Sequence, residues 1–183
     1  MKMKDYRGII SKNAARLREL NAEIKRTFKA EPHGPAHHAA CAAFHSEYDA
    51  LAFPGGLNVS LVSLKTGDPR VVDIAVQYLE VEPLFFRSGY ISETILRYLK
   101  HVPLSSDQVT RLVNVIGNSI RHGGRRRFVN CARLAGVLND DRIYSGALTL
   151  SRESAPETKR RAEHILDVMK TKKANKALEF TSQ

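Results

Sequence analysis

The sequence predicts an all-α fold built from antiparallel helix pairs, with long helices at both ends. Apolar residues recur at steps of three and four through most of the 183 residues, which is the spacing of one face of an α-helix. Proline and glycine interrupt this pattern at intervals and mark the connections between helices. Hydrophobic residues make up 43% of the chain, enough for a buried core, and we expect a single domain over residues 1–183.

The N-terminal part of the chain predicts a helical hairpin over residues 1–52. Apolar residues at helical spacing indicate a first helix over residues 4–30, and Glu31-Pro32-His33-Gly34-Pro35 ends it. An alanine-rich helix is expected over residues 36–52, and Pro54-Gly55-Gly56 breaks the pattern after it. Small residues on this second helix would let a neighbouring helix approach closely.

Residues 57–66 admit two interpretations. They alternate well enough for a short strand, but the neighbouring segments are helical, so we expect a short helix. From Asp68 onward the sequence carries clear helix-start signals, such as Asp68-Pro69 and Ser105-Ser106-Asp107. One further helix is expected to start at Asp68. Five more are expected over residues 90–101, 107–121, 125–138, 142–150 and 156–178. They form a repeat-like core, residues 58–150, and a C-terminal basic helix within residues 151–183.

Two segments of this core resemble HEAT-like repeats. Asp68-Pro69-Arg70-Val71, followed by Ala75 and Leu79, resembles the second helix of such a repeat. Cys131-Ala132-Arg133-Leu134-Ala135-Gly136-Val137-Leu138-Asn139-Asp140 is similar to its small-residue-rich helix and the turn that follows. The family pattern has an arginine after the valine, where this chain has Val72.

Helix starts recur in this region at intervals of about 35–39 residues, slightly below the length of HEAT and armadillo units. The resemblance covers about residues 58–150 and implies a short α-solenoid stack with a concave face. An irregular helical bundle is the alternative.

Positive charge is distributed unevenly along the chain, whose net charge is +10. Residues 1–30 carry +6, residues 105–127 carry +4 and residues 151–183 carry +3, whereas residues 31–104 carry −3. Such basic segments either keep a protein in solution or form a surface for a polyanion, such as nucleic acid or an anionic membrane face.

The most informative motif is His122-Gly123-Gly124-Arg125-Arg126-Arg127, between two expected helices. Three arginines in a first helical turn oppose the helix dipole, whose N-terminal end is already positive. We expect Gly123 to form a left-handed cap, and the following free N–H groups and guanidiniums to bind an anion. The alternative is a solvated turn whose arginines pair with Asp140 or Asp141. The predicted anion- or nucleic-acid-binding residues are Arg121, Gly123, Gly124, Arg125, Arg126 and Arg127, extended by Lys25, Arg26 and Lys29 on the first helix and by Lys159, Arg160 and Arg161 on the last.

Two other groups of residues are candidate sites. His37, Cys41 and His45 share one helical face. His37 and His45 are eight residues apart, which is about 12 Å along the helix axis and too far for both to bind one metal ion. Without a second ligand pair we expect a surface stripe and no metal. The aromatic residues of Phe85-Phe86-Arg87-Ser88-Gly89-Tyr90 could stack on bases, but we expect them in the core.

The leading functional prediction is a non-enzymatic binding module for a polyanion, with nucleic-acid backbone as the expected ligand. A protein-interaction scaffold of the helical-repeat type is the first alternative, and self-association through Ile10, Leu17 and Ile24 is another. The resemblance also admits a DNA-acting enzyme, but helical-repeat DNA glycosylases commonly use tryptophan, and this chain has none. Because the sequence contains no recognisable catalytic or phosphate-loop motif, we expect no catalytic residue and no cofactor.

Composition also predicts where the protein resides. Cys41 and Cys131 are far apart without a CxxC motif, which favours a reducing cytoplasm over a disulfide framework. The sequence has no apolar run of about 18 residues, so we expect no membrane span. No apolar segment follows the first charges, so we expect no signal peptide.

Overall fold

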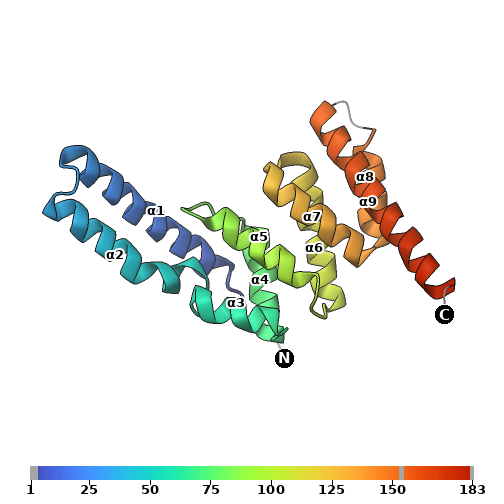
Figure 1. The fold of residues 1–183 in the computed structure, drawn as a ribbon, viewed down its shortest axis with the longest axis horizontal. Coiled ribbons are helices and arrows are strands. Elements are labelled where there is room, and N and C mark those ends of the chain that lie inside the picture. The colour runs from blue at the N-terminus through green and yellow to red at the C-terminus, as the bar shows by residue number, and fades with distance from the viewer. Residues whose placement is uncertain (1–3, 153–154, 182–183) are drawn as a thin grey trace. The chain divides into compact units, whose positions relative to one another are not determined.

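The computed structural model describes residues 4–152 and 155–181, with side chains described up to residue 173. Within these residues every helix or strand assigned is an α-helix (Figure 1), so the predicted all-α class is confirmed. The ambiguous segment near residue 60 is helical, as expected. None of the helices in the described part of the chain is long and apolar enough to cross a membrane.

The chain divides into two compact units, Met1–Ile95 and Leu96–Gln183. The helices that begin in unit 1 are α1 (Arg7–Ala30), α2 (Pro35–Ala52), α3 (Leu57–Lys65), α4 (Pro69–Val81) and α5 (Ser88–Leu99). The helices of unit 2 are α6 (Ser106–His122), α7 (Arg125–Leu138), α8 (Asp141–Leu150) and α9 (Pro156–Thr181). The boundary between the two units falls inside α5.

In unit 1, α1 packs along α2 and against α4, and α3 packs against α2 and α4. Ile10, Ala14 and Leu17 of α1 are buried in this packing. The expectation that Ile10 and Leu17 mediate self-association is therefore wrong, because the chain's own helices already cover them.

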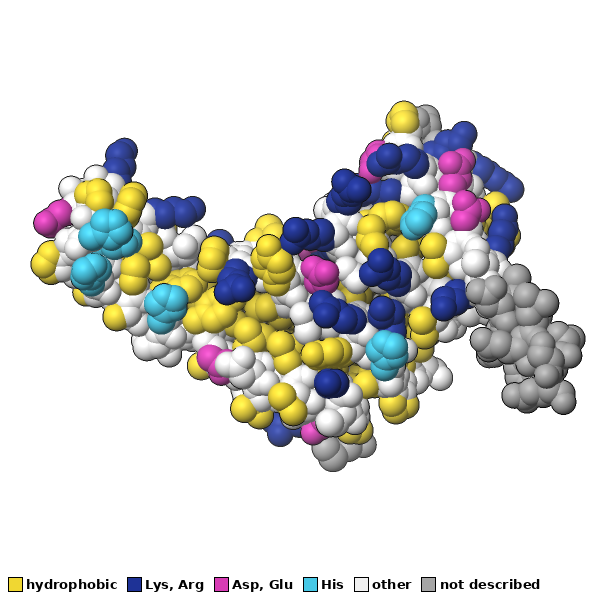
Figure 2. Space-filling model, viewed as in Figure 1, with side chains coloured by type: hydrophobic (Ala, Val, Ile, Leu, Met, Phe, Trp, Pro, Cys, Tyr) yellow, Lys and Arg dark blue, Asp and Glu magenta, His cyan; other side chains and the backbone are white. Residues whose placement is uncertain are grey.

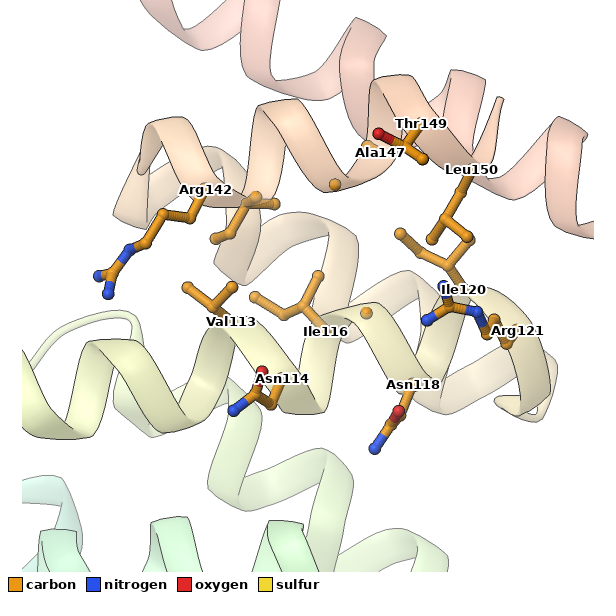
Figure 3. A pocket seen from close by; sticks show the side chains of 13 residues that line it. Val113, Asn114, Ile116, Asn118, Ile120, Arg121, Arg142, Ala147, Thr149 and Leu150 are labelled. Atoms are coloured by element: carbon orange, nitrogen blue, oxygen red, sulfur yellow. The ribbon is translucent and has the colours of Figure 1, made fainter. Parts of the chain in front are cut away.

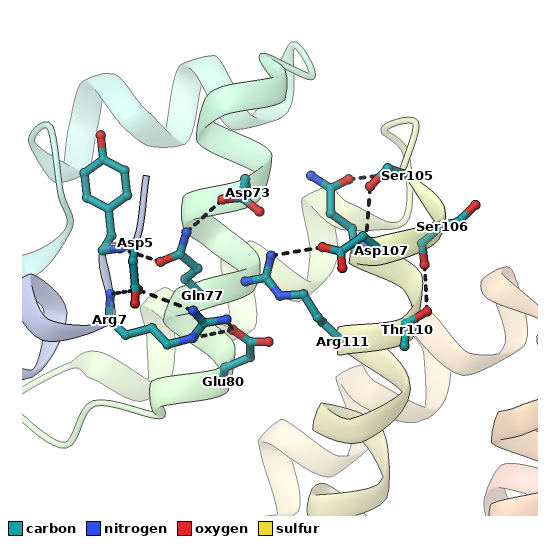
Figure 4. Close-up of polar contacts among 12 residues, drawn as sticks. Asp5, Arg7, Asp73, Gln77, Glu80, Ser105, Ser106, Asp107, Thr110 and Arg111 are labelled. Atoms are coloured by element: carbon teal, nitrogen blue, oxygen red, sulfur yellow. Dashed lines mark hydrogen bonds and ion pairs between the residues drawn. The ribbon is translucent and has the colours of Figure 1, made fainter. Parts of the chain in front are cut away.

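The first helix begins at Arg7 rather than at residue 4, because α4 holds the preceding backbone. The N–H of Tyr6 donates to Oε1 of Gln77 at 2.6 Å, and Nε2 of Gln77 donates to the carbonyl of Lys4 at 3.0 Å. The same Nε2 donates to Oδ2 of Asp73 at 2.7 Å (Figure 4). Residues 4–6 thus bond to α4 instead of forming a helical turn.

We expect Gln77→Leu to destabilise unit 1 by about 1–3 kcal/mol, because the buried carboxylate of Asp73 and the N–H of Tyr6 would each lose a hydrogen bond. Urea unfolding followed by circular dichroism measures this loss. Glu80→Gln is the matched control, since Glu80 contacts the exposed Arg7 and such pairs contribute about 0–1 kcal/mol. Equal unfolding midpoints for the Gln77 variant and the wild type would contradict the bridging role.

In unit 2, α6 packs against α7 and α8, and α9 packs against α6, α7 and α8. A capping box starts α6: Ser105 Oγ accepts the N–H of Gln108 at 3.2 Å, and Gln108 Oε1 accepts the N–H of Ser105 at 2.9 Å (Figure 4). The side chain of Asp140 caps α8 in a similar way. The apolar residues buried in this unit include Leu112, Ile116, Ile120, Leu134, Ala135, Ile143, Ala162 and Ile165.

Candidate polyanion-binding surface

The net positive charge of the chain belongs almost entirely to unit 2. Residues 96–183 contain 17 Lys and Arg against 8 Asp and Glu, whereas residues 1–95 contain 12 against 11. Figure 2 shows Lys and Arg side chains gathered over the visible face of unit 2. Unit 2 is therefore the part of the chain whose charge favours a polyanion.

A groove of about 640 Å³ lies between α7 and α9. It is lined by Arg125, Phe128, Val129, Glu157, Arg160, Arg161 and His164. The structure thus brings Arg125, from the Gly-Gly-Arg motif, together with Arg160 and Arg161 from the last helix. Two basic segments that are more than 30 residues apart in the sequence meet in one groove.

Arg161 forms the fixed wall of this groove. Its Nε donates to Oε1 of Glu157 at 2.9 Å, and its guanidinium lies over the ring of Phe128 at 5.4 Å. Its Nη1 also approaches the carbonyl of Ser119, near the C-terminal end of α6, at 3.5 Å. Only 15% of the Arg161 side chain is exposed, so packing holds this cation in place.

Arg160 and Arg125 are the exposed cations of the groove. The side chain of Arg160 is 77% exposed, and its Nη2 lies 2.8 Å from Oε2 of Glu157. Hydrogen bonds from Arg160, with the charges of both arginines, hold the pKa of Glu157 below its ordinary value. One carboxylate therefore serves both Arg160 and Arg161, and together with Arg125 the groove keeps an excess of positive charge.

The Gly123-Gly124 connection differs from the expected left-handed cap. Gly123 has φ −67° and ψ 138°, and Gly124 has φ −63° and ψ 152°, so both are extended. The N–H of Gly123 bonds to the carbonyl of Ser119 at 3.0 Å. The connection has only these two residues, so the chain passes from α6 into α7 without room for a separate capping turn. The expectation of a left-handed Gly123 is wrong.

The first turn of α7 carries the three arginines of the tip at the positive end of the helix dipole. No side chain of the described residues caps its N-terminus, and its first turn contains no acidic residue. Asp140, one of the two acids considered as partners of the tip, pairs instead with Arg142 at 2.8 Å. Hydrogen bonds from Arg142 keep the pKa of Asp140 low.

The tip arginines do not all face one groove. Arg121 lines a second groove of about 500 Å³ between α6 and α8, and Arg142 lies toward its other end (Figure 3). Apolar side chains such as Ile116 and Leu150 line much of this groove, with Asn114 beside them. Arg126 is exposed and Arg127 half-buried at the start of α7.

The remaining predicted cations lie outside the α7–α9 groove lining. Lys159 is exposed on α9, next in sequence to Arg160. Lys25, Arg26 and Lys29 are exposed on α1, in unit 1, and Arg26 pairs with Glu23. Sequence reasoning missed the two ring side chains of the groove, Phe128 and His164, whose centroids are 5.7 Å apart. Phe128 is buried and His164 is exposed, so hydrophobic periodicity did not mark them as a pair.

The aromatic segment after α4 is more exposed than predicted. Phe86 and Tyr90 are each 55% exposed, so the expected core role is wrong for both. Left-handed Arg87, with φ 68°, precedes Ser88, the first residue of α5. Ser88 is buried and its Oγ accepts the N–H of Phe85 at 3.2 Å. The chain turns at this point and presents Tyr90 to solvent in the first turn of the helix.

The histidine-rich face of α2 brings two side chains together. Sγ of Cys41 lies 3.6 Å from Nε2 of His37, and the ring of Phe28 packs edge-on against His37 at 5.3 Å. Among the described residues, no group of three or more His, Cys, Asp or Glu side chains is placed to hold a metal ion.

Comparison with protein-family models, with curated proteins and with solved structures found no match to this chain.

Proposed function

We propose that residues 96–183 bind a polyanion, with nucleic-acid backbone as the expected ligand, in the groove between α7 and α9. The convergence of Arg125, Arg160 and Arg161 in one groove, with Glu157 as the one carboxylate among the described lining residues, carries this proposal. A phosphate there would meet two exposed guanidiniums and the positive N-terminal end of α7. The excess of positive charge in unit 2 supports the same ligand class.

Recognition of this kind is mainly electrostatic and depends little on base sequence. Guanidiniums bind phosphate oxygens through paired, charge-assisted hydrogen bonds, and such contacts position a strand without reading its bases. Neutralising each phosphate releases condensed counterions, so affinity falls as salt rises. The salt dependence therefore reports how many cations contact the strand.

Titration of a labelled oligonucleotide, single-stranded and as the matching duplex, tests this proposal by fluorescence anisotropy. The two phosphate contacts of Arg125 and Arg160 should weaken binding by about 7- to 12-fold between ~50 and ~200 mM salt. A scrambled oligonucleotide of equal length should bind equally well. Absence of binding at the lower salt concentration, or binding that salt leaves unchanged, would refute the proposal.

A protein-interaction scaffold of the HEAT-like type is the second candidate. Its support is the arrangement of α6–α9 as two helix pairs, whose caps, Ser105 and Asp140, are 35 residues apart. The groove between α6 and α8, whose lining includes apolar side chains such as Ile116 and Leu150, would receive a side-chain row of a partner helix. Binding to a partner that persists at high salt, with no oligonucleotide binding at low salt, would favour this candidate.

A further inference from the structure

Another groove lies within unit 1, between α2, α3 and the start of α5. Its volume is about 380 Å³, and sites for small molecules commonly measure about 300–1,000 Å³. Its lining includes the rings of Tyr48 and Tyr90, the charges of Asp49 and Arg87, and apolar Leu61 and Ile91. A groove of this size and mixed lining suits a small ligand that carries both a ring and a charge.

Arg87 and Tyr90 form a cation–ring pair in the wall of this groove. Cζ of Arg87 lies 5.9 Å from the centroid of the Tyr90 ring, and both side chains are exposed. Within the described part of the chain, no ion pair includes Arg87. Because Tyr90 does not lie in the core, base stacking is the remaining alternative that the sequence offered for this residue.

The backbone of Arg87 adopts a conformation that glycine holds more easily. Its φ of 68° lies in the left-handed region, where the Cβ of an L-residue crowds the following carbonyl. The carbonyl of Arg87 accepts the N–H of Tyr90 at 3.0 Å and thereby starts the first turn of α5. Glycine would satisfy this turn with less strain, so the turn itself does not require an arginine. Strain of this kind is commonly retained where a side chain has a functional role.

The turn between α2 and α3 forms another part of the wall and occupies the groove's carboxylate. Gly55 and Gly56, with φ 91° and 87°, reverse the chain after α2. Oδ1 of Asp49 accepts the N–H of Asn58 at 3.0 Å, and a Cβ on Gly56 would lie 2.9 Å from Oδ2 of Asp49. Asp49, the one carboxylate among the described lining residues, is thus held by the first turn of α3 and leaves Arg87 for an external anion.

We propose that this groove binds an aromatic base together with its phosphate, the chemistry shared by a free nucleotide and a single-stranded nucleic acid. The exposed ring of Tyr90 would stack on the base, and the guanidinium of Arg87 would bind the phosphate. Leu61 and Ile91 add apolar surface for the base. The inference goes beyond the α7–α9 groove and does not depend on it, because every residue involved belongs to unit 1.

Titration of isotopically labelled protein with adenosine monophosphate, followed by NMR of the backbone amides, tests this proposal. The amides of residues 45–49, 57–61 and 87–94 should shift together and yield one Kd. Adenosine and inorganic phosphate each carry one half of the ligand, so each should shift these amides only at higher concentration. A single-stranded oligonucleotide that binds here more tightly than the mononucleotide identifies nucleic acid as the source of the base, and the reverse order identifies a free nucleotide.

Two variants separate the ring from the charge. Tyr90→Ala should weaken binding of the mononucleotide by about 5- to 150-fold, since it removes one stacking platform. Arg87→Gly should weaken it by about 10- to 100-fold and also raise the urea midpoint, because glycine relieves the left-handed strain. Tyr144→Ala is the matched control, since Tyr144 is an exposed tyrosine on α8 that does not line this groove, and it should bind like the wild type.

Three results would overturn the inference. The first is that millimolar adenosine monophosphate leaves these amides unchanged, or shifts only those near Arg125 and Arg160, which would leave the proposed function intact. The second is equal affinity for inorganic phosphate and the mononucleotide, which would remove the role of the ring. The third is an Arg87→Gly variant that binds weakly and is also less stable, which would show a structural role. Mononucleotide binding in unit 1 without oligonucleotide binding in unit 2 would refute the proposed function alone.

Discussion

Replacing Arg125 and Arg160 together with alanine is expected to weaken oligonucleotide binding by about 25- to 60-fold at ~0.1 M salt. The loss follows from two phosphate contacts, and the log–log salt slope should flatten by about 1.4 for a single strand and about 1.8 for a duplex. Both side chains are exposed and Arg161 keeps its contacts with Phe128, so the groove itself should persist. Fluorescence anisotropy over a series of salt concentrations measures both quantities.

The double variant Lys12→Ala/Lys65→Ala is the matched control for this experiment. It removes the same charge from exposed positions on α1 and α3 of unit 1. If the control weakens binding as much as the arginine variant, net charge alone governs affinity and the α7–α9 groove has no special role. Unfolding midpoints should be nearly equal for the wild type and both variants, because exposed charges contribute little to stability.

Gly123→Ala is expected to destabilise unit 2 by about 1–3 kcal/mol, whereas Gly124→Ala should stay within about 0.5 kcal/mol of the wild type. A Cβ on Gly123 would lie 2.6 Å from the carbonyl oxygen of Ser119, and backbone cannot rotate away as a side chain can. A Cβ on Gly124 would meet nothing within 4 Å. Gly124→Ala is therefore the matched control for Gly123→Ala when the free energy of unfolding is measured in urea.

The same pair of variants tests how the connection positions the groove. A shifted α7 would move Arg125 relative to Arg160, so Gly123→Ala should also weaken oligonucleotide binding. Gly124→Ala should bind like the wild type. Equal stability of the two variants would contradict the steric requirement at Gly123, and the connection would then have to tolerate a side chain at either position.

Local signals in the sequence predicted the helices of this protein well. Start signals at Asp68 and Ser105 and the breaks at Pro54 and Gly123 depend only on neighbouring residues, and the helices begin and end within a few residues of them. The start of α1 is instructive: the apolar pattern predicts residue 4, but the side chain of Gln77 on α4 takes the N–H of Tyr6. A bond across more than 70 residues cannot be inferred from helical periodicity.

The candidate site was predicted only in part. The sequence identified Arg125, Arg160 and Arg161 by charge, but their meeting in one groove depends on the packing of α7 against α9. Arg121 was grouped with Arg125, but the two side chains line different grooves. The reason is that the chain changes direction at Gly123-Gly124. Arg121 and Arg125 are four residues apart in the sequence, but they do not lie one turn apart on a single helix.

The sequence by itself determined that this protein is helical, where its helices start and stop, and that its C-terminal half is strongly basic. Tertiary structure decided which cations share a surface and which aromatic rings face solvent. The physical reason is the range of the interactions: hydrogen-bond caps and the 3.6-residue period act within one or two turns. The rotation of each helix about its own axis is set instead by side chains from distant segments, as Gly136 of α7 and Val168 of α9 show.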